Sequence, residues 1–234
     1  MVNTRAIAVI PARGGSKRLP RKNILPFGGR PMIAWTIDAA LRSGLFDTVL
    51  VSTEDAEIAE IARAEGAEVP FLRTAFYDDT TPISAATILA VDQMRSWSNR
   101  NHDLVVQLMA NCPLRGSDEI IRAITAFQAS KADFQISCTR FGWLNPWWAL
   151  QLDANGAGSW AFPDAARSRS QDLPPLYVPT GAIWIAHAGP LVAAGTFYGP
   201  GHRFEPMPWQ SAVDIDDAED LAFAETALRL RTAS

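Results

Sequence analysis

Cysteine, lysine and long apolar runs are scarce in this chain of 234 residues. Two cysteines, Cys112 and Cys138, cannot form a disulfide framework, so the sequence predicts a protein of the reducing cytoplasm. No apolar run approaches the ~20 residues of a membrane span, and the short run at 6–12 is typical of a buried strand. The formal net charge of −4 does not favour a general nucleic-acid binder. We therefore expect neither a membrane nor a nucleic acid as partner.

Short apolar runs alternate with amphipathic segments along most of the chain. The runs predict strands at 6–10, 48–52, 104–109, 134–138 and 181–186. The amphipathic segments predict helices at 31–43, 55–65, 83–97, 117–130 and 217–230, with Ser117 and Asp217 as caps of the last two. This alternation predicts one α/β domain over residues 1–234, with a mainly parallel sheet covered on both faces. Ligands of such sheets bind at the carboxyl ends of strands.

The loop after the first strand concentrates positive charge. Between Arg13 and Lys22 it holds five cations and no acid, and two of the chain's three lysines lie here. Gly14 and the glycine after it let the backbone turn and approach a ligand closely, and backbone N–H groups in such a turn can hold anionic oxygens. The loop matches neither the Walker A nor the G-x-G-x-x-G spacing. We interpret it as a phosphate-binding loop; the alternative is a solvated basic turn.

Two carboxylates near the other end of the chain suit a metal ion. Asp214 and Asp216 are two residues apart in an extended segment, so they point to one side while Ile215 points to the other. Such a pair suits a hard cation that keeps several waters. The alternative is an acidic helix start, because acids also favour the positive end of a helix dipole.

Five ordered motifs resemble one family. They are ARGGSKRLPRKN at 12–23, FDTVLVSTEDAEIAEIARAEGAEVPFLR at 46–73, NCPLR at 111–115, RSQDLPPLYVPTGAIWIA at 169–186 and SAVDID at 211–216. Together they resemble the acylneuraminate (CMP-sialic acid) cytidylyltransferases and their relatives for other nine-carbon keto-acid sugars. The resemblance implies a Rossmann-like nucleotidyltransferase domain in which residues 139–180 form a dimerisation insert that helps complete the partner's site, and hence a homodimer.

The resemblance also implies roles for single residues. CTP would be held by the first loop and by a threonine, the matching residues being Ala12, Arg13, Gly14, Lys17, Lys22, Asn23 and Thr80 or Thr81, with Arg13, Lys17 and Lys22 as the catalytic cations. Arg169 and Gln171 match positions near the sugar acid, and Asp214 and Asp216 match the carboxylates that bind Mg²⁺. The implied reaction is attack of the anomeric hydroxyl of a nine-carbon 2-keto-3-deoxy sugar acid on the α-phosphorus of CTP.

Some positions depart from the family pattern. Met109 stands where a polar contact to the base is usual, Pro82 replaces a serine, and Val178-Pro179-Thr180-Gly181 replaces an Arg-Pro-Asn-Gly segment. The acceptor sugar and any general base are therefore left open. The alternatives are a 3-deoxy-octulosonate cytidylyltransferase, a sugar-1-phosphate nucleotidyltransferase and a non-catalytic nucleotide-binding protein.

Aromatic residues gather in the irregular segment. Trp143, Trp147 and Trp148 flank Asn145-Pro146, and we expect them to pack in an interface or core. Stacking on the base is the alternative. The three histidines show no metal-ligand spacing.

Overall fold

The computed structural model describes residues 5–76, 78 and 81–232. One six-stranded sheet has the order β10-β6-β9-β5-β1-β4. Its strands are β1 (Ala6–Pro11), β4 (Thr48–Ser52), β5 (Leu104–Gln107), β6 (Phe134–Arg140), β9 (Tyr177–His187) and β10 (Arg203–Pro206). β9 runs antiparallel to both of its neighbours, whereas the pairs β4–β1, β1–β5 and β6–β10 are parallel. The predicted mainly parallel α/β sheet is confirmed, with one reversed strand inside it.

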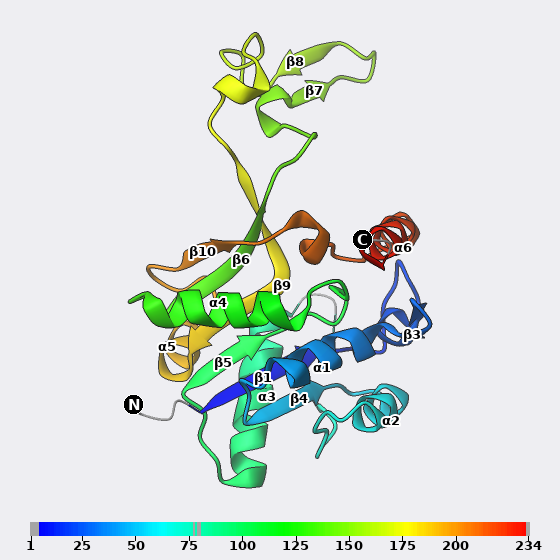
Figure 1. The fold of residues 1–234 in the computed structure, drawn as a ribbon, viewed down its shortest axis with the longest axis vertical. Coiled ribbons are helices and arrows are strands. Elements are labelled where there is room, and N and C mark those ends of the chain that lie inside the picture. The colour runs from blue at the N-terminus through cyan, green and yellow to red at the C-terminus, as the bar shows by residue number, and fades with distance from the viewer. Residues whose placement is uncertain (1–4, 77, 79–80, 233–234) are drawn as a thin grey trace.

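Helices cover both faces of the sheet (Figure 1). They are α1 (Met32–Ser43), α2 (Ala56–Ala64), α3 (Ile83–Ser98), α4 (Ser117–Ala129), α5 (Ala188–Ala194) and α6 (Ala218–Thr232). Alternate residues of β1 face opposite ways, as the pleat requires. Ala8 and Ile10 pack towards α1, α2 and α4, while Ile7 and Val9 pack towards α3 and α5. Both faces of the central strand are thus buried, which explains its continuous apolar run.

Most helix boundaries follow from the sequence, and one predicted cap is wrong. Asp55 caps α2 by accepting a hydrogen bond from the backbone N–H of Ile58. Asp217 does the same for α6, accepting from Glu219 and Asp220. Ser117, by contrast, is the first residue of α4 and not its cap. Gly116 takes the cap position, and its N–H donates to the Glu119 carboxylate at 3.0 Å. The Glu119 side chain, at the third position of the helix, therefore provides the hydrogen-bond acceptor at the N-terminal end of α4.

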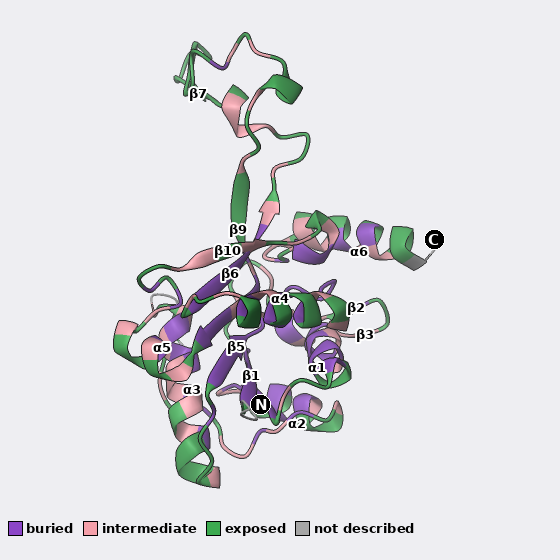
Figure 2. Cartoon of the chain, turned by 60° about the vertical axis from the view of Figure 1, so that its left-hand side comes forward, coloured by how far each residue is buried: buried purple, intermediate pink, exposed green. Residues whose placement is uncertain are grey.

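The irregular segment projects from the sheet as an arm. β6 and β9 pair as far as Arg140 and Tyr177, and the chain between these two residues rises above the body (Figure 1). The arm, residues 141–176, holds a hairpin of β7 (Leu150–Leu152) and β8 (Gly158–Trp160). Figure 2 shows its surface as mostly exposed, whereas β1, β4 and β5 of the sheet are buried. Trp143 is 87% exposed and does not pack in a core of this chain. Trp147 packs edge-on against Phe162 within the arm.

A short hairpin near the start of the chain packs against the C-terminal helix α6. β2 (Pro26–Phe27) and β3 (Arg30–Pro31) follow the basic loop. Phe27 is fully buried in a cluster with Ile215 and with Ala224 and Ala227 of α6. This packing places residues 213–217 next to the basic loop, residues 13–22. No helix in the described part of the chain is long and apolar enough to cross a membrane.

Candidate active site

A cavity of about 220 Å³ opens at the carboxyl ends of β1 and β5. Its walls come from the basic loop, from the stretch after α2, from the start of α3 and from the turn after β5. The lining residues are Pro11, Ala12, Arg13, Ser16, Lys22, Asn23, Arg73, Phe76, Asp78, Thr81, Ile83, Ala86, Met109 and Asn111. Five of the predicted nucleotide-binding residues therefore meet at one place, namely Ala12, Arg13, Lys22, Asn23 and Thr81. Thr80 lies outside the described residues, and Lys17 is exposed and not among the lining residues.

The basic loop is tied to the strands beside it. Ala12 donates its N–H to the carbonyl of Ser52 at the end of β4, at 3.0 Å. The buried Asn23 donates its side-chain amide to the carbonyl of Arg13 at 2.9 Å, closing the loop on itself. Gly14 donates its N–H to Glu54 at 2.7 Å. The loop is thus shaped by its own residues and by the strand next to it, in keeping with a preformed anion-binding turn.

Gly14 is placed where a side chain does not fit. A Cβ at this position would lie 2.5 Å from the Asp55 Oδ2 atom, whereas a Cβ at Gly15 would meet nothing within 4 Å. We expect Gly14→Ala to lower the free energy of unfolding by about 1–3 kcal/mol, the usual cost of overpacking, and to weaken CTP binding. Gly15→Ala is the matched control. Thermal unfolding and CTP titration measure both variants; equal behaviour of the two would contradict a tight fit at Gly14.

The loop's positive charge is largely compensated by acids from other elements. Arg21 lies at 2.5 Å from Asp55 and also contacts Glu57. Lys22 donates to Asp216 at 2.7 Å, and Arg18 donates to the other oxygen of Asp216 at 2.5 Å. The sequence shows no acid within the loop, yet the fold brings three carboxylates to its cations. These ion pairs join residues far apart in the chain and could not be predicted from the loop itself.

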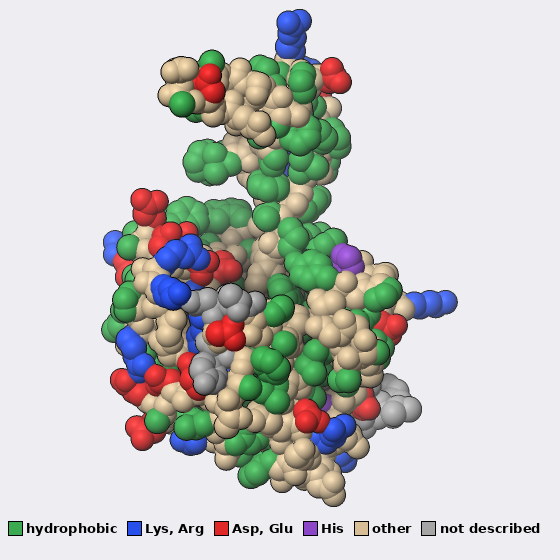
Figure 3. Space-filling view, turned by 180° about the vertical axis from the view of Figure 1, so that it is seen from behind, with side chains coloured by type: hydrophobic (Ala, Val, Ile, Leu, Met, Phe, Trp, Pro, Cys, Tyr) green, Lys and Arg blue, Asp and Glu red, His purple; other side chains and the backbone are tan. Residues whose placement is uncertain are grey.

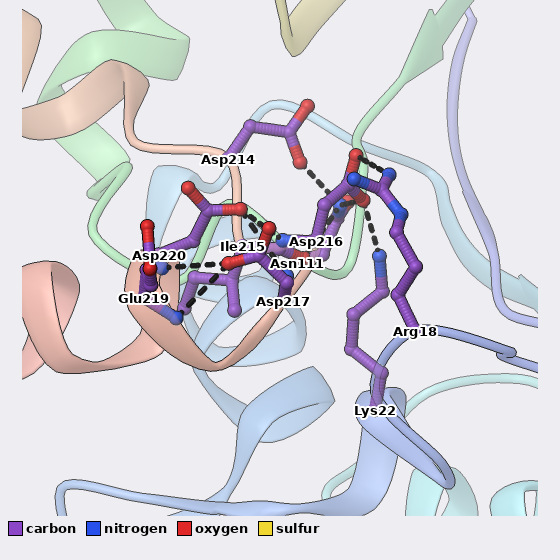
Figure 4. A network of polar contacts seen from close by, with 9 residues as sticks. All are labelled: Arg18, Lys22, Asn111, Asp214, Ile215, Asp216, Asp217, Glu219 and Asp220. Atoms are coloured by element: carbon purple, nitrogen blue, oxygen red, sulfur yellow. Dashed lines mark hydrogen bonds and ion pairs between the residues drawn. The ribbon is translucent and has the colours of Figure 1, made fainter.

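The two aspartates predicted as metal ligands lie beside the cavity (Figure 4). They are joined to it by Asn111, whose side-chain amide donates to Asp214, to the Asp216 carboxylate at 3.3 Å and to the carbonyl of Ile215 at 3.2 Å. Ile215 in turn donates its N–H to the Asn111 carbonyl at 2.9 Å and buries its side chain. The carboxylates therefore face one way and the isoleucine the other, as their spacing predicts.

The two carboxylates have different environments. Burial, and after it the negative charge of Asp216, raises the pKa of Asp214 to about 6. Burial acts on Asp216 too, but hydrogen bonds from Lys22 and Arg18 outweigh it and hold the pKa of Asp216 below its ordinary value. Asp214 forms no ion pair with any described residue. Asp214 is itself exposed, and two neighbouring carboxylates reached by solvent are a favourable place for a hydrated cation.

Arg73 is a site residue that the sequence reasoning missed. It lines the cavity, its side chain is only 2% exposed, and it donates to Glu54 at 3.1 Å. Its Nε and Nη1 atoms have no hydrogen-bond partner among the described residues. Burial lowers the pKa of Arg73, against the opposing charge of Glu54. The available signal was an arginine directly after the apolar run VPFL, at the end of a stretch that pairs with the sheet edge.

Apolar side chains form the end of the cavity away from the loop. Ile83, Ala86 and Met109 line it. Behind Met109 lies the buried Gln107, whose side-chain oxygen accepts from Thr87 at 2.6 Å and whose amide faces the Met109 sulfur at 3.8 Å. The side-chain amide of Gln107 therefore lies outside the lining of the cavity, and its oxygen is already hydrogen-bonded to Thr87.

The predicted sugar-binding residues lie elsewhere, in the arm. Arg169 is mostly exposed and forms a two-pronged pair with Asp172, at 2.7 and 3.2 Å. Gln171 lines a separate cavity of about 420 Å³ at the root of the arm, together with Arg140 and Trp209. Neither residue lines the nucleotide cavity. Figure 3 shows the arm standing clear of the body, with charged side chains gathered on the body below it.

Fold and site together define a class of protein. A mainly parallel sheet whose first loop brings cations to a cavity at the strand ends, in contact with an acid pair, suits the binding of a nucleotide's phosphates. The chain belongs to the cytidylyltransferase family, because residues 7–142 match the family model described as "Cytidylyltransferase".

Similar proteins support this assignment. The chain is 33% identical to a pseudaminic acid cytidylyltransferase of Campylobacter jejuni, over 97% of this chain and 98% of that protein. It is 32% identical to a CMP-N,N'-diacetyllegionaminic acid synthase of Legionella pneumophila, over 97% of each. A CMP:2-keto-3-deoxy-manno-octonic acid synthetase solved in complex with CTP has the same fold, with a TM-score of 0.70 and 16% identity over 97% of this chain and 100% of that one.

Proposed function

We propose that this chain transfers CMP from CTP to the anomeric hydroxyl of a sialic-acid-like nonulosonic acid. The hydroxyl oxygen forms a bond to the α-phosphorus, the bond from that phosphorus to the bridging oxygen breaks, pyrophosphate leaves, and the hydroxyl proton passes to solvent. The observation that carries the proposal is the contact between the basic loop and the acid pair, with Lys22 at 2.7 Å from Asp216 beside one cavity. Family membership and the relatives named above support it.

The chain's own residues supply charge and alignment for this displacement. Arg13, Lys22 and Arg73 line the cavity and would neutralise the triphosphate and the leaving pyrophosphate. Asn23 holds the loop closed on Arg13. The apolar end with Met109 would take the base. Such a reaction depends on positioning and charge stabilisation more than on covalent help.

Mg²⁺ is the proposed cofactor, and the donor set fits it. Asp214 and Asp216 offer carboxylate oxygens side by side, and Asp214 is exposed and forms no ion pair among the described residues, which leaves it available to a hydrated cation. When bound, Mg²⁺ would neutralise phosphate oxygens and help to orient the nucleotide. Asn111 keeps both carboxylates on the side of the cavity.

The acceptor is proposed to be a nine-carbon sugar acid of the pseudaminic or legionaminic type. Relatives named for these acids cover nearly the whole of this chain. Arg169 and Gln171 would meet the sugar acid, with Arg169 gripping its carboxylate. Because both lie in the arm, away from the nucleotide cavity of their own chain, we propose a homodimer in which each arm serves the partner's cavity. The exposed aromatic residues of the arm suit such an interface. We propose the cytoplasm as the compartment, in keeping with two free, buried cysteines.

A turnover panel tests the function. The protein is incubated with Mg²⁺, with each of the four nucleoside triphosphates in turn, and with pseudaminic, legionaminic, sialic or octulosonic acid or a sugar 1-phosphate as acceptor. Pyrophosphate release is measured. We expect release with a nine-carbon acid and with CTP above the other three nucleoside triphosphates. Turnover only with octulosonic acid or only with a sugar 1-phosphate would replace the proposed acceptor. CTP binding without turnover on any acceptor would indicate a non-catalytic nucleotide-binding protein.

A further inference from the structure

Asp216 pairs with two cations of the phosphate-binding loop, Lys22 and Arg18. Its Oδ1 atom lies 2.7 Å from the Lys22 Nζ atom, and its Oδ2 atom lies 2.5 Å from Arg18. Figure 4 shows both cations turned away from the loop backbone and towards this one carboxylate. Two cations of the loop, of which Lys22 lines the cavity, are therefore paired with an acid from the far end of the chain.

Burial makes this pairing matter. The Lys22 side chain is only 14% exposed, so its ammonium group needs a counter-charge when no ligand is present. Asp216 takes one of the three donors of the ammonium group, so phosphate oxygens can still reach Lys22, but a carboxylate left in place would repel them. A nucleotide can use Lys22 fully only if Asp216 gives it up.

The backbone around Asp216 is held independently of its side chain. The Ile215 N–H donates to the Asn111 carbonyl at 2.9 Å, and the Asp216 and Asp217 N–H groups donate to Asp220 at 2.9 and 3.2 Å. Asn111 also keeps its bond to Asp214. The Asp216 carboxylate can therefore change partners by rotating about its own side-chain bonds, while the segment that carries it stays in place.

We propose that Asp216 is an exchangeable counter-ion: it neutralises Lys22 and Arg18 until a nucleotide binds and releases them to the phosphates when a divalent cation takes its carboxylate. The proposal rests on the proposed function, because it assigns the same loop to the nucleotide. It gives the divalent cation a second effect on nucleotide binding, since the cation frees two positive charges of the protein in addition to accompanying the phosphates.

Asp216→Asn tests the proposal through binding of CTP in a chelator, with no acceptor sugar present. Glu57→Gln is the matched control, because it removes one exposed carboxylate that pairs with Arg21 of the same loop. We expect Asp216→Asn to bind metal-free CTP about tenfold more tightly than the wild type, as expected when a competing partner is removed from a largely buried cation. Glu57→Gln should change the affinity by about twofold or less, in line with an exposed ion pair. Isothermal titration calorimetry measures all three proteins.

Calcium in place of the chelator gives the second half of the test. We expect Ca²⁺ to tighten CTP binding to the wild type and to Glu57→Gln by more than it tightens binding to Asp216→Asn. An affinity of Asp216→Asn for metal-free CTP no greater than that of Glu57→Gln would overturn the proposal. If Asp216→Asn does not fold, Asp216→Ser removes the same carboxylate with a smaller side chain. Failure of the turnover panel would leave this comparison intact, so the two proposals fail separately.

Discussion

Replacing Asp214 by Asn is expected to lower kcat by about 100-fold or more while leaving the fold intact. Loss of groups that only orient a metal ligand already costs 10–100-fold, and Asp214 is proposed as a ligand itself. The same change removes one of two neighbouring negative charges, since Asp214 lies beside Asp216 and forms no ion pair with a described residue. We therefore expect the melting temperature of Asp214→Asn to equal or exceed that of the wild type.

Steady-state pyrophosphate release at several Mg²⁺ concentrations, with thermal unfolding, measures both effects. Asp38→Asn is the control, since Asp38 lies on α1 and pairs only with Arg42 on the same helix among the described residues. Wild-type turnover in Asp214→Asn would show that this carboxylate does not serve the reaction. A large drop in melting temperature together with lost activity would point to a structural role instead.

Lys22→Ala is expected to lower kcat/KM for CTP by about 100–1,000-fold, comparable with the loss of one preorganised charge-stabilising donor. Lys22 lines the cavity and is largely buried, so its charge acts in a water-poor site. Lys17→Ala is the comparison, because Lys17 comes from the same loop but is exposed and outside the lining. We expect a smaller loss there. Equal losses of kcat/KM in the two variants would contradict the expectation that the largely buried Lys22 contributes more than the exposed Lys17.

The same variant tests the arm. In a mixture of Lys22→Ala and Arg169→Ala protomers, a hybrid dimer has one site with an intact loop and an intact partner arm. Random exchange should then restore about a quarter of wild-type activity from two inactive proteins. Activity no greater than the sum of the separate variants would refute a site completed by the partner.

Local sequence signals predicted the elements that depend on local chemistry. The apolar run of β1 and the cap of α2 at Asp55 are determined by neighbouring residues. The reversed direction of β9 and the short edge strand β10 were not predicted, because strand direction follows from where the chain re-enters the sheet. The motif GAIWIA at 181–186 predicts a strand, but it does not predict whether that strand runs parallel or antiparallel to its neighbours.

The site was predictable in part for the same reason. The loop and the acid pair are visible in the sequence because each is a local cluster. Their pairing through Lys22 and Asp216 joins residues 194 positions apart and depends on the packing of Phe27 against α6. Arg73 and Asn111 gave weaker signals, since a single arginine or asparagine after an apolar run is common in any globular protein. Long-range packing decided which of the candidate cations entered the cavity.

The way the arm is attached has an evolutionary consequence. The chain leaves the sheet at Arg140 and returns at Tyr177, and these residues face each other as partners across two adjacent antiparallel strands. Everything between them can be lengthened, trimmed or swapped without altering strand order or the nucleotide end of the molecule. If the arm meets the acceptor, as we propose, selection for a new acceptor can act on residues 141–176 alone and leave the nucleotide-binding loop unchanged.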